Sequence, residues 1–190
     1  MDNLIDDSYF WGKLRIGNIV SITTQNTAHA KAVEEKKNEI TGYITRYQSK
    51  FLKMLLGDEV YKNPPQAIID LIVDSKARIS PLANYVFCMY QIENMSFATP
   101  SGEKKLTAPD TVEEDVRFKV ANAWNDMVDL NQIIHQTMYE AQTTGGKNYL
   151  NDILDNMDVC VEYVLRGNKK QTIILEGAIF NKRSKYDFNK

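Results

Sequence analysis

One stretch of the sequence, from Leu82 to Tyr90, is apolar on nearly every side of a helix. Ser80 precedes it as a suitable N-cap, and Pro81 fits the first helical position, so a helix is predicted to begin at Pro81. A helix that is apolar all round has no flank that can face water. The sequence therefore predicts a domain in which this helix is the most buried element and other segments surround it.

A long helix is predicted before this stretch, over residues 27–56. Its apolar residues recur at steps of three and four, which is the period of a helix with one buried face: Ile40, Tyr43, Ile44, Tyr47, Phe51, Met54 and Leu55. Gly57 follows as a C-cap. The first half, 28–39, is polar and charged, so we expect it to reach solvent or a partner. A shorter helix is predicted after Pro64-Pro65.

A second long helix is predicted from Thr111 to about Thr143. Thr111 and Glu114 have the spacing of a capping box, and Gly145-Gly146 would stop the helix. The expected apolar face consists of Val116, Val120, Ala123, Trp124, Met127, Leu130, Ile134 and Met138. Between the two apolar segments, residues 96–110 are rich in Pro, Gly, Ser and Thr and predict a long protruding loop.

The two ends of the chain differ from this helical middle. Leu14 and Ile16 alternate with polar residues as in a short strand, and three adjacent aromatic residues, Tyr9 to Trp11, must pack either on the domain's own core or on a neighbour. Residues 158–190 are rich in β-prone side chains around a turn at 166–170, which predicts a hairpin. The candidate interface residues are Tyr9, Phe10, Trp11, Thr172, Ile173, Ile174 and Leu175.

The predicted fold is therefore mainly α: a helical bundle with long helices, a short extended N-terminal arm and a C-terminal β-hairpin. We divide the chain into an arm at 1–25, a helical domain at 26–157 and a β-prone extension at 158–190.

No pattern of catalytic, cofactor-binding or metal-binding residues is apparent, so we expect a protein that is not an enzyme and carries no cofactor. The two histidines, His29 and His135, lie far apart in sequence, and Cys88 and Cys160 lack the spacing of a metal site. Gly145-Gly146-Lys147 lacks the remaining residues of a phosphate-binding loop. The nearest approach to a stacking platform for nucleic acid consists of Tyr43, Arg46, Tyr47, Lys50, Phe51 and Lys53, but an amphipathic helix explains these residues better.

Net charge and hydropathy favour no nucleic-acid or membrane partner. The formal net charge is −2, which provides no strong attraction to phosphate. No apolar run is long enough to span a bilayer, and the acidic start does not resemble a signal peptide, so we expect folding in the cytoplasm.

Four segments, in this order, resemble the head–tail connector proteins of tailed bacteriophages of the crAss-like type and of related Bacteroides prophages. They are the opening Leu4 to Ile16, the stretch Ile44 to Tyr61 with Leu55-Leu56-Gly57, the helix Ser80 to Tyr90, and a Thr/Ser/Gly loop at 99–102 followed by a long helix bearing Ala123-Trp124-Asn125. The likeness spans about two thirds of the chain and fades after residue 145.

The resemblance implies a structural virion protein that forms a homo-oligomeric ring, twelve-fold in such necks, between the portal and the tail. Its partners would be further copies of itself, the portal protein, and tail or second-ring proteins. DNA would pass through the channel without specific binding during genome ejection, and assembly would take place in the host cytoplasm. The alternatives are another tail or collar subunit of the virion, a small helical nucleic-acid-binding regulator, or a small helical enzyme.

Overall fold

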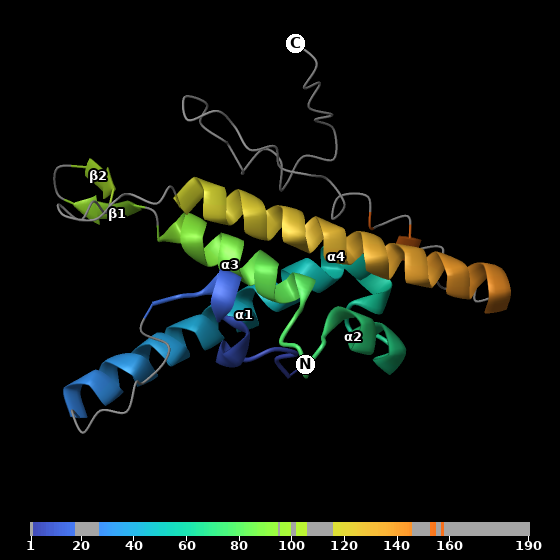
Figure 1. The fold of residues 1–190 in the computed structure, drawn as a ribbon, viewed down its shortest axis with the longest axis horizontal. Coiled ribbons are helices and arrows are strands. Elements are labelled where there is room, and N and C mark those ends of the chain that lie inside the picture. The colour runs from blue at the N-terminus through green and yellow to red at the C-terminus, as the bar shows by residue number, and fades with distance from the viewer. Residues whose placement is uncertain are drawn as a thin grey trace, which may run out of the picture.

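The computed structural model describes residues 2–17, 27–94, 96–99, 102–105, 116–145, 153–154 and 157. Within these residues the protein is mainly α, with four helices: α1 (Thr27–Val60), α2 (Gln66–Ile72), α3 (Pro81–Glu93) and α4 (Val116–Gly145). Two 3-10 turns, η1 (Asp7–Tyr9) and η2 (Gly12–Leu14), precede α1, and two short strands, β1 (Ser96–Thr99) and β2 (Gly102–Lys105), follow α3 (Figure 1).

Helix α3 is the centre of the fold, as the sequence predicts. It packs against both α1 and α4, and every residue from Pro81 to Tyr90 is buried. The start is also as predicted, because the Ser80 hydroxyl accepts a hydrogen bond from the Leu82 N–H at 3.2 Å and Pro81 occupies the first turn. The N-cap therefore determines where the most buried element begins.

Tyr85 connects the three main helices. Its ring centroid lies 5.5 Å from that of Phe51 and 6.1 Å from that of Tyr47 on α1, and 6.4 Å from that of Trp124 on α4. These separations and the inclined ring planes are those of favourable aromatic pairs. The Cys88 thiol, one turn further along α3, donates to the Val120 carbonyl of α4 at 3.5 Å.

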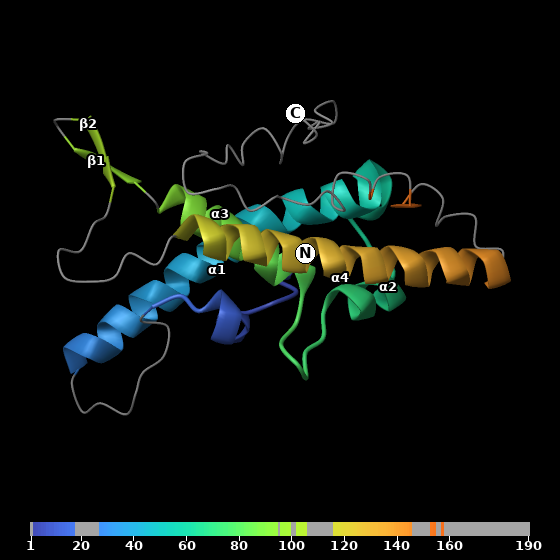
Figure 2. The same ribbon diagram turned by 45° about the horizontal axis from the view of Figure 1, so that its top comes forward.

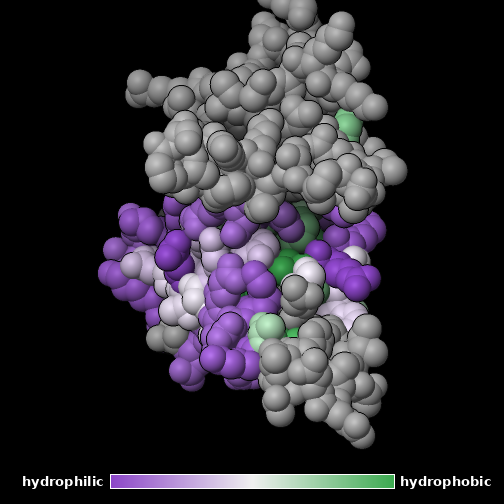
Figure 3. Space-filling model, turned by 90° about the vertical axis from the view of Figure 1, so that its left-hand side faces the viewer, coloured by the Kyte–Doolittle hydropathy of each residue, from purple (hydrophilic) through white to green (hydrophobic). Residues whose placement is uncertain are grey.

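Helix α1 has the predicted buried face, with Ile40, Ile44, Phe51 and Leu55 fully buried. Of its described side chains before Ile40, most are exposed, and this half extends past the end of α3 (Figures 1 and 2). The surface at that end of the molecule is mainly hydrophilic where its residues are described (Figure 3).

Gly57 interrupts α1 with φ 79° and ψ 172°. This conformation is open to glycine and is strained for residues that carry a Cβ. The predicted helix end at Gly57 is confirmed as a break, after which one more turn leads to Val60.

Helix α4 buries the predicted face from Val120 to Met138 except for Leu130, which is half-buried, and it ends at Gly145 as expected. The burial of Val116 is not among the described features. The capping-box residues Thr111 and Glu114 lie outside the described residues. Asn131 is fully buried on the same face.

The N-terminal segment is not an extended arm, and Leu14 and Ile16 do not form a strand. Residues 2–17 form two 3-10 turns that pack on the helices: η1 contacts α1, and η2 contacts both α3 and α4. Ile5, Leu14 and Ile16 are buried in the common core. The reason is the all-round apolar character of α3, since α1 and α4 leave a flank that another segment has to cover.

Part of the expected loop at 96–110 forms a hairpin instead. Ser96 pairs with Lys105 and Thr99 with Gly102, in antiparallel register. Only two residues separate the strands, and two-residue loops are the commonest hairpin connections. The prediction of a loop was based on the content of Pro, Gly and Ser, which does not reveal strand pairing. The predicted C-terminal hairpin at 158–190 lies outside the described residues.

We expect Tyr85→Ala, Phe87→Ala and Met89→Ala each to lower the free energy of unfolding by about 2–5 kcal/mol, because each removes a side chain that is at most 5% exposed. Denaturant unfolding followed by circular dichroism measures this change. Ile133→Ala, at a side chain that is 63% exposed, is the control and should change stability by less than about 0.5 kcal/mol. Equal losses at all four positions would contradict a central α3.

The two glycines of α1 should respond to alanine in opposite directions. Gly57→Ala forces a Cβ into a positive φ and should destabilise the fold by about 1–3 kcal/mol. Gly42→Ala, where an added Cβ meets no atom within 4 Å, should stabilise it by about 0.5–1 kcal/mol. Thermal unfolding of the two variants tests this, and a stable Gly57→Ala protein would show that the break is dispensable.

Candidate assembly surface

The structure separates the three adjacent aromatic residues of the predicted interface. Tyr9 and Phe10 are 4% and 1% exposed and belong to the core, whereas Trp11 is 55% exposed. Of the two alternatives that the sequence left open, packing on the chain's own core therefore holds for Tyr9 and Phe10. We retain Trp11 as a candidate contact. Thr172, Ile173, Ile174 and Leu175 lie outside the described residues.

Trp11 is exposed on a backbone that hydrogen bonds hold in place. The Phe10 N–H donates to the Asp7 carbonyl at 3.1 Å, and the Leu14 N–H donates to the Trp11 carbonyl at 3.2 Å. Asp6 caps η1 by accepting from the Ser8 N–H at 2.9 Å. Burial alone would raise the pKa of Asp6, but the hydrogen bonds from Ser8 and the positive charges of Arg78 and Lys37 together lower that pKa. An aromatic side chain on a fixed backbone loses little entropy when it binds a partner.

A tight turn between α2 and α3 forms the next part of this surface. Asp74 and Ile79 exchange backbone hydrogen bonds of 3.0 and 3.2 Å, and the Asp74 carboxylate accepts from the N–H groups of Lys76 and Ala77 at 2.9 Å. Arg78 has a φ of 56°, which costs free energy at a residue other than glycine. The turn leaves Ile79 49% exposed.

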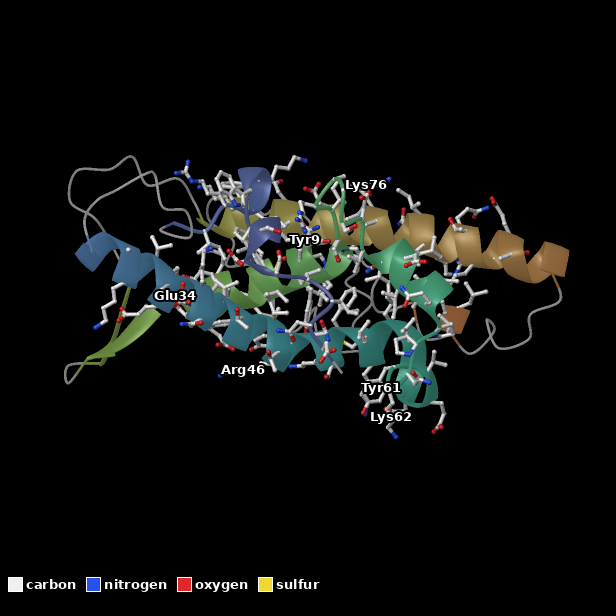
Figure 4. The ribbon with its side chains drawn as sticks, turned by 90° about the horizontal axis from the view of Figure 1, so that it is seen from below. Tyr9, Glu34, Arg46, Tyr61, Lys62 and Lys76 are labelled. Atoms are coloured by element: carbon white, nitrogen blue, oxygen red, sulfur yellow. The ribbon has the colours of Figure 1, made fainter. Side chains whose placement is uncertain are left out.

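The turn and the N-terminal segment lie side by side. The Arg78 guanidinium lies 5.5 Å from the centre of the Tyr9 ring, and the labelled Tyr9 and Lys76 are neighbours in Figure 4. From the exposed residues of these two segments we select the basic and apolar ones and call them the basic surface: Trp11, Lys13, Arg15, Lys76, Arg78 and Ile79. The same segments also expose the carboxylates of Asp6 and Asp74. Of these six residues the sequence predicted Trp11 as an interface residue, and no sequence pattern brings residue 78 to residue 9.

A different surface follows the outward side of α4. Residues at alternating steps of three and four lie away from the core there, and we call them the acidic stripe: Asp126, Asp129, Ile133, Gln136 and Glu140. Ile133 is 63% exposed, and Tyr139 beside the stripe is 50% exposed. The sequence has no Lys or Arg from Val120 to Gly145. An ion pair from Lys13 Nζ to Asp126 Oδ2, at 3.3 Å, joins the two surfaces within the chain.

The aromatic and basic residues of α1 form an amphipathic helix face, the interpretation that the sequence favours. Tyr43 is half-buried, and the Arg46 guanidinium lies 5.6 Å from the centre of its ring. Tyr47 is buried, and the Lys50 ammonium lies 5.7 Å from the centre of its ring. The Tyr47 hydroxyl donates to the Glu93 carboxylate, which also pairs with Arg46 at 3.2 Å. Burial, then the contact with Glu93, raises the pKa of Tyr43 to about 12. These rings are engaged with α3 and are not a free stacking platform.

The described residues contain no group of three His, Cys, Asp or Glu side chains that could hold a metal ion. Burial strongly raises the pKa of the Cys88 thiol, which keeps it protonated and opposes its use as a nucleophile. In that same part of the chain, no helix is both long and apolar enough to cross a membrane. What remains as the candidate functional site is the pair of surfaces defined above.

Comparison with protein-family models, curated protein sequences and solved structures finds no significant match to this chain.

The N-terminal segment should behave as part of the core. Phe10→Ala should lower the free energy of unfolding by about 3–5 kcal/mol, and deletion of residues 1–12, which removes Ile5, Tyr9 and Phe10, should cost more. The neighbouring Trp11→Ser is the matched control and should change stability by less than about 0.5 kcal/mol. Urea unfolding of the three proteins gives the result. A deletion variant as stable as the full chain would restore the arm interpretation.

Proposed function

We propose that this chain is a structural subunit of a tailed-bacteriophage neck, one copy of a closed ring that joins the portal to the tail. The observation that carries the proposal is where the four resembling segments lie. Each contributes to one hydrophobic core: Phe10 from the opening, Leu55 from α1, Tyr85 from α3 and Trp124 from α4. The resemblance therefore covers the residues on which the fold depends, and not a scattered set of surface positions.

The shape of the described part suits this role. Helices α1 and α4 have 34 and 30 residues and extend past the 13-residue α3 at opposite ends (Figures 1 and 2). Helix ends that project from a compact centre can reach neighbouring subunits in a ring. The net charge of −2 suits a channel through which DNA passes without being retained.

The rest of the assignment follows from the same proposal. The ring is a dodecamer located in the virion neck and assembled in the host cytoplasm, with the portal on one side and tail or second-ring proteins on the other. The helices form a bundle, and residues 158–190 form a hairpin in which Thr172, Ile173, Ile174 and Leu175 contribute to assembly. The chain has no catalytic role and needs no cofactor.

Particles made with and without this chain test the proposal. With the chain, electron microscopy of purified virions should locate a labelled copy at the head–tail junction. Without it, we expect heads and tails that are made but not joined, and complementation by the full chain should restore joining. The exposed Lys62→Ala variant is a control that should complement fully. Complete, joined particles in the absence of the chain would refute the proposal, and a labelled copy elsewhere on the tail would favour a tail or collar subunit.

A further inference from the structure

Gln48 is a polar residue at a core position of α1. It lies one turn after Ile44 and one turn before Leu52, both of which are fully buried. Gln48 itself is only 3% exposed. A carboxamide carries both donors and an acceptor, and burial without partners for these groups costs free energy. The side chain at this position therefore needs a polar partner inside the protein.

The partner of Gln48 is the main chain of the N-terminal segment. The Leu4 N–H donates to Gln48 Oε1 at 2.6 Å, and Gln48 Nε2 donates to the Asp2 carbonyl at 2.9 Å. In a β-sheet, a neighbouring strand provides hydrogen bonds to the N–H and C=O groups of a chain. Here one side chain provides a bond of each kind. At the surface beside it, Asn3 Nδ2 donates to Thr45 Oγ1 at 3.2 Å.

These two hydrogen bonds select one register of the N-terminal segment. A shift by one residue would remove the Asp2 carbonyl and the Leu4 N–H from the carboxamide and leave both of its groups buried without these partners. Apolar contacts discriminate less between the two registers, because Leu4 and Ile5 are adjacent and both apolar. Selection of a register is the best-attested role of a buried polar side chain.

The register at residues 2–4 is carried along the chain to Trp11. Ile5 and Phe10 are buried in the core, and η1 lies between them. Hydrogen bonds close this turn, since the Tyr9 N–H donates to the Asp6 carbonyl at 3.3 Å and the Phe10 N–H donates to that of Asp7. Because the segment is held at each of these steps, the place of its first residues determines where Trp11 is exposed.

We infer that the Gln48 carboxamide is a binding site for the main chain of residues 2–4, and that it positions Trp11 by fixing the register of the N-terminal segment. Gln48 is a positioning residue, because it acts on Trp11 through this segment and not by contact. The inference goes beyond the proposed function and does not depend on it, because it concerns how the chain presents Trp11 to any partner.

Replacement of Gln48 by leucine on the full-length chain removes both hydrogen bonds and leaves a side chain of similar size. In Gln48→Leu, the Leu4 amide hydrogen should exchange about tenfold faster than in the wild type, as measured by NMR. Labelling with 5-fluorotryptophan gives one fluorine resonance for each of the two tryptophans, Trp11 and Trp124. The Trp11 resonance, assigned with Trp11→Phe, should shift or broaden in Gln48→Leu, and that of Trp124 should stay in place.

Gln48→Glu separates hydrogen bonding from packing, because its effect should depend on pH. A protonated carboxyl group can accept from the Leu4 N–H and donate to the Asp2 carbonyl, whereas a carboxylate has no donor for that carbonyl. Burial and this bond raise the pKa of the introduced carboxyl above its usual value of about 4.3. The bound segment is therefore retained below the raised pKa and is released as the pH rises through it. The Trp11 resonance should match the wild type near about pH 4 and Gln48→Leu near about pH 8.

The wild type and Gln48→Leu, measured at the same pH values, correct for the native carboxylates of this segment, Asp2, Asp6 and Asp7. Two further variants are controls. Gln136→Leu makes the same change at an exposed glutamine of α4, and Thr45→Ala removes the exposed bond to Asn3. Each should change the exchange rate of the Leu4 amide by less than about twofold.

Several results would overturn the inference. One is a Leu4 amide as protected in Gln48→Leu as in the wild type, and another is a Gln48→Glu protein that follows the wild type at every pH. Release of the segment by Thr45→Ala to the same extent would assign its register to the surface contact instead. An unchanged Trp11 resonance after release would show that Gln48 does not position Trp11. If Gln48→Leu fails to fold, the pH titration of Gln48→Glu decides.

Discussion

The burial of α3 on all sides is the constraint on which the rest of the structure depends. Ten consecutive residues of one helix avoid water, which two packed helices cannot achieve because each covers one flank. Tyr85 shows the arrangement in one side chain, since its ring contacts α1 and α4 at once. The N-terminal segment covers the remaining flank, and Phe10 is only 1% exposed there. The first residues of the chain are therefore needed to cover α3 and are not free to form an arm.

The parts of the fold that could be predicted from sequence are those decided by neighbours in the chain. Ser80 and Pro81 determine a helix start through one local hydrogen bond, and Gly57 ends a helix because of its own backbone freedom. Which of Tyr9, Phe10 and Trp11 faces water depends on the placement of η1 and η2 against helices far away in sequence. The same holds for Arg78, whose contact with Tyr9 joins segments about 70 residues apart. Periodicity carries no information on such contacts, so Trp11 is the residue of the two candidate surfaces that the sequence identified as an interface residue.

Exposed apolar side chains are common on soluble proteins, and one alone would indicate nothing about function. Trp11, Ile79 and Ile133 are informative because of what surrounds them. The first two lie on backbone fixed by short turns and among basic groups, and the third lies on a regular helix among acidic groups. Rigid elements present these side chains, so binding need not order a loop first, and less of the binding free energy is lost to ordering.

Buried and exposed apolar side chains stand next to one another along this chain. Phe10 stabilises the core while Trp11 faces outward, and Ile134 is buried while Ile133 is 63% exposed. Adjacent residues of a tight turn or an α-helix point in different directions, so one short segment can both contribute to the core and present a side chain to solvent. Substitution of the exposed member of each pair should leave the domain folded, whereas substitution of the buried member should destabilise it. The effect of a substitution at Trp11 or Ile133 on binding can therefore be separated from an effect on folding, because the core that both residues border remains intact.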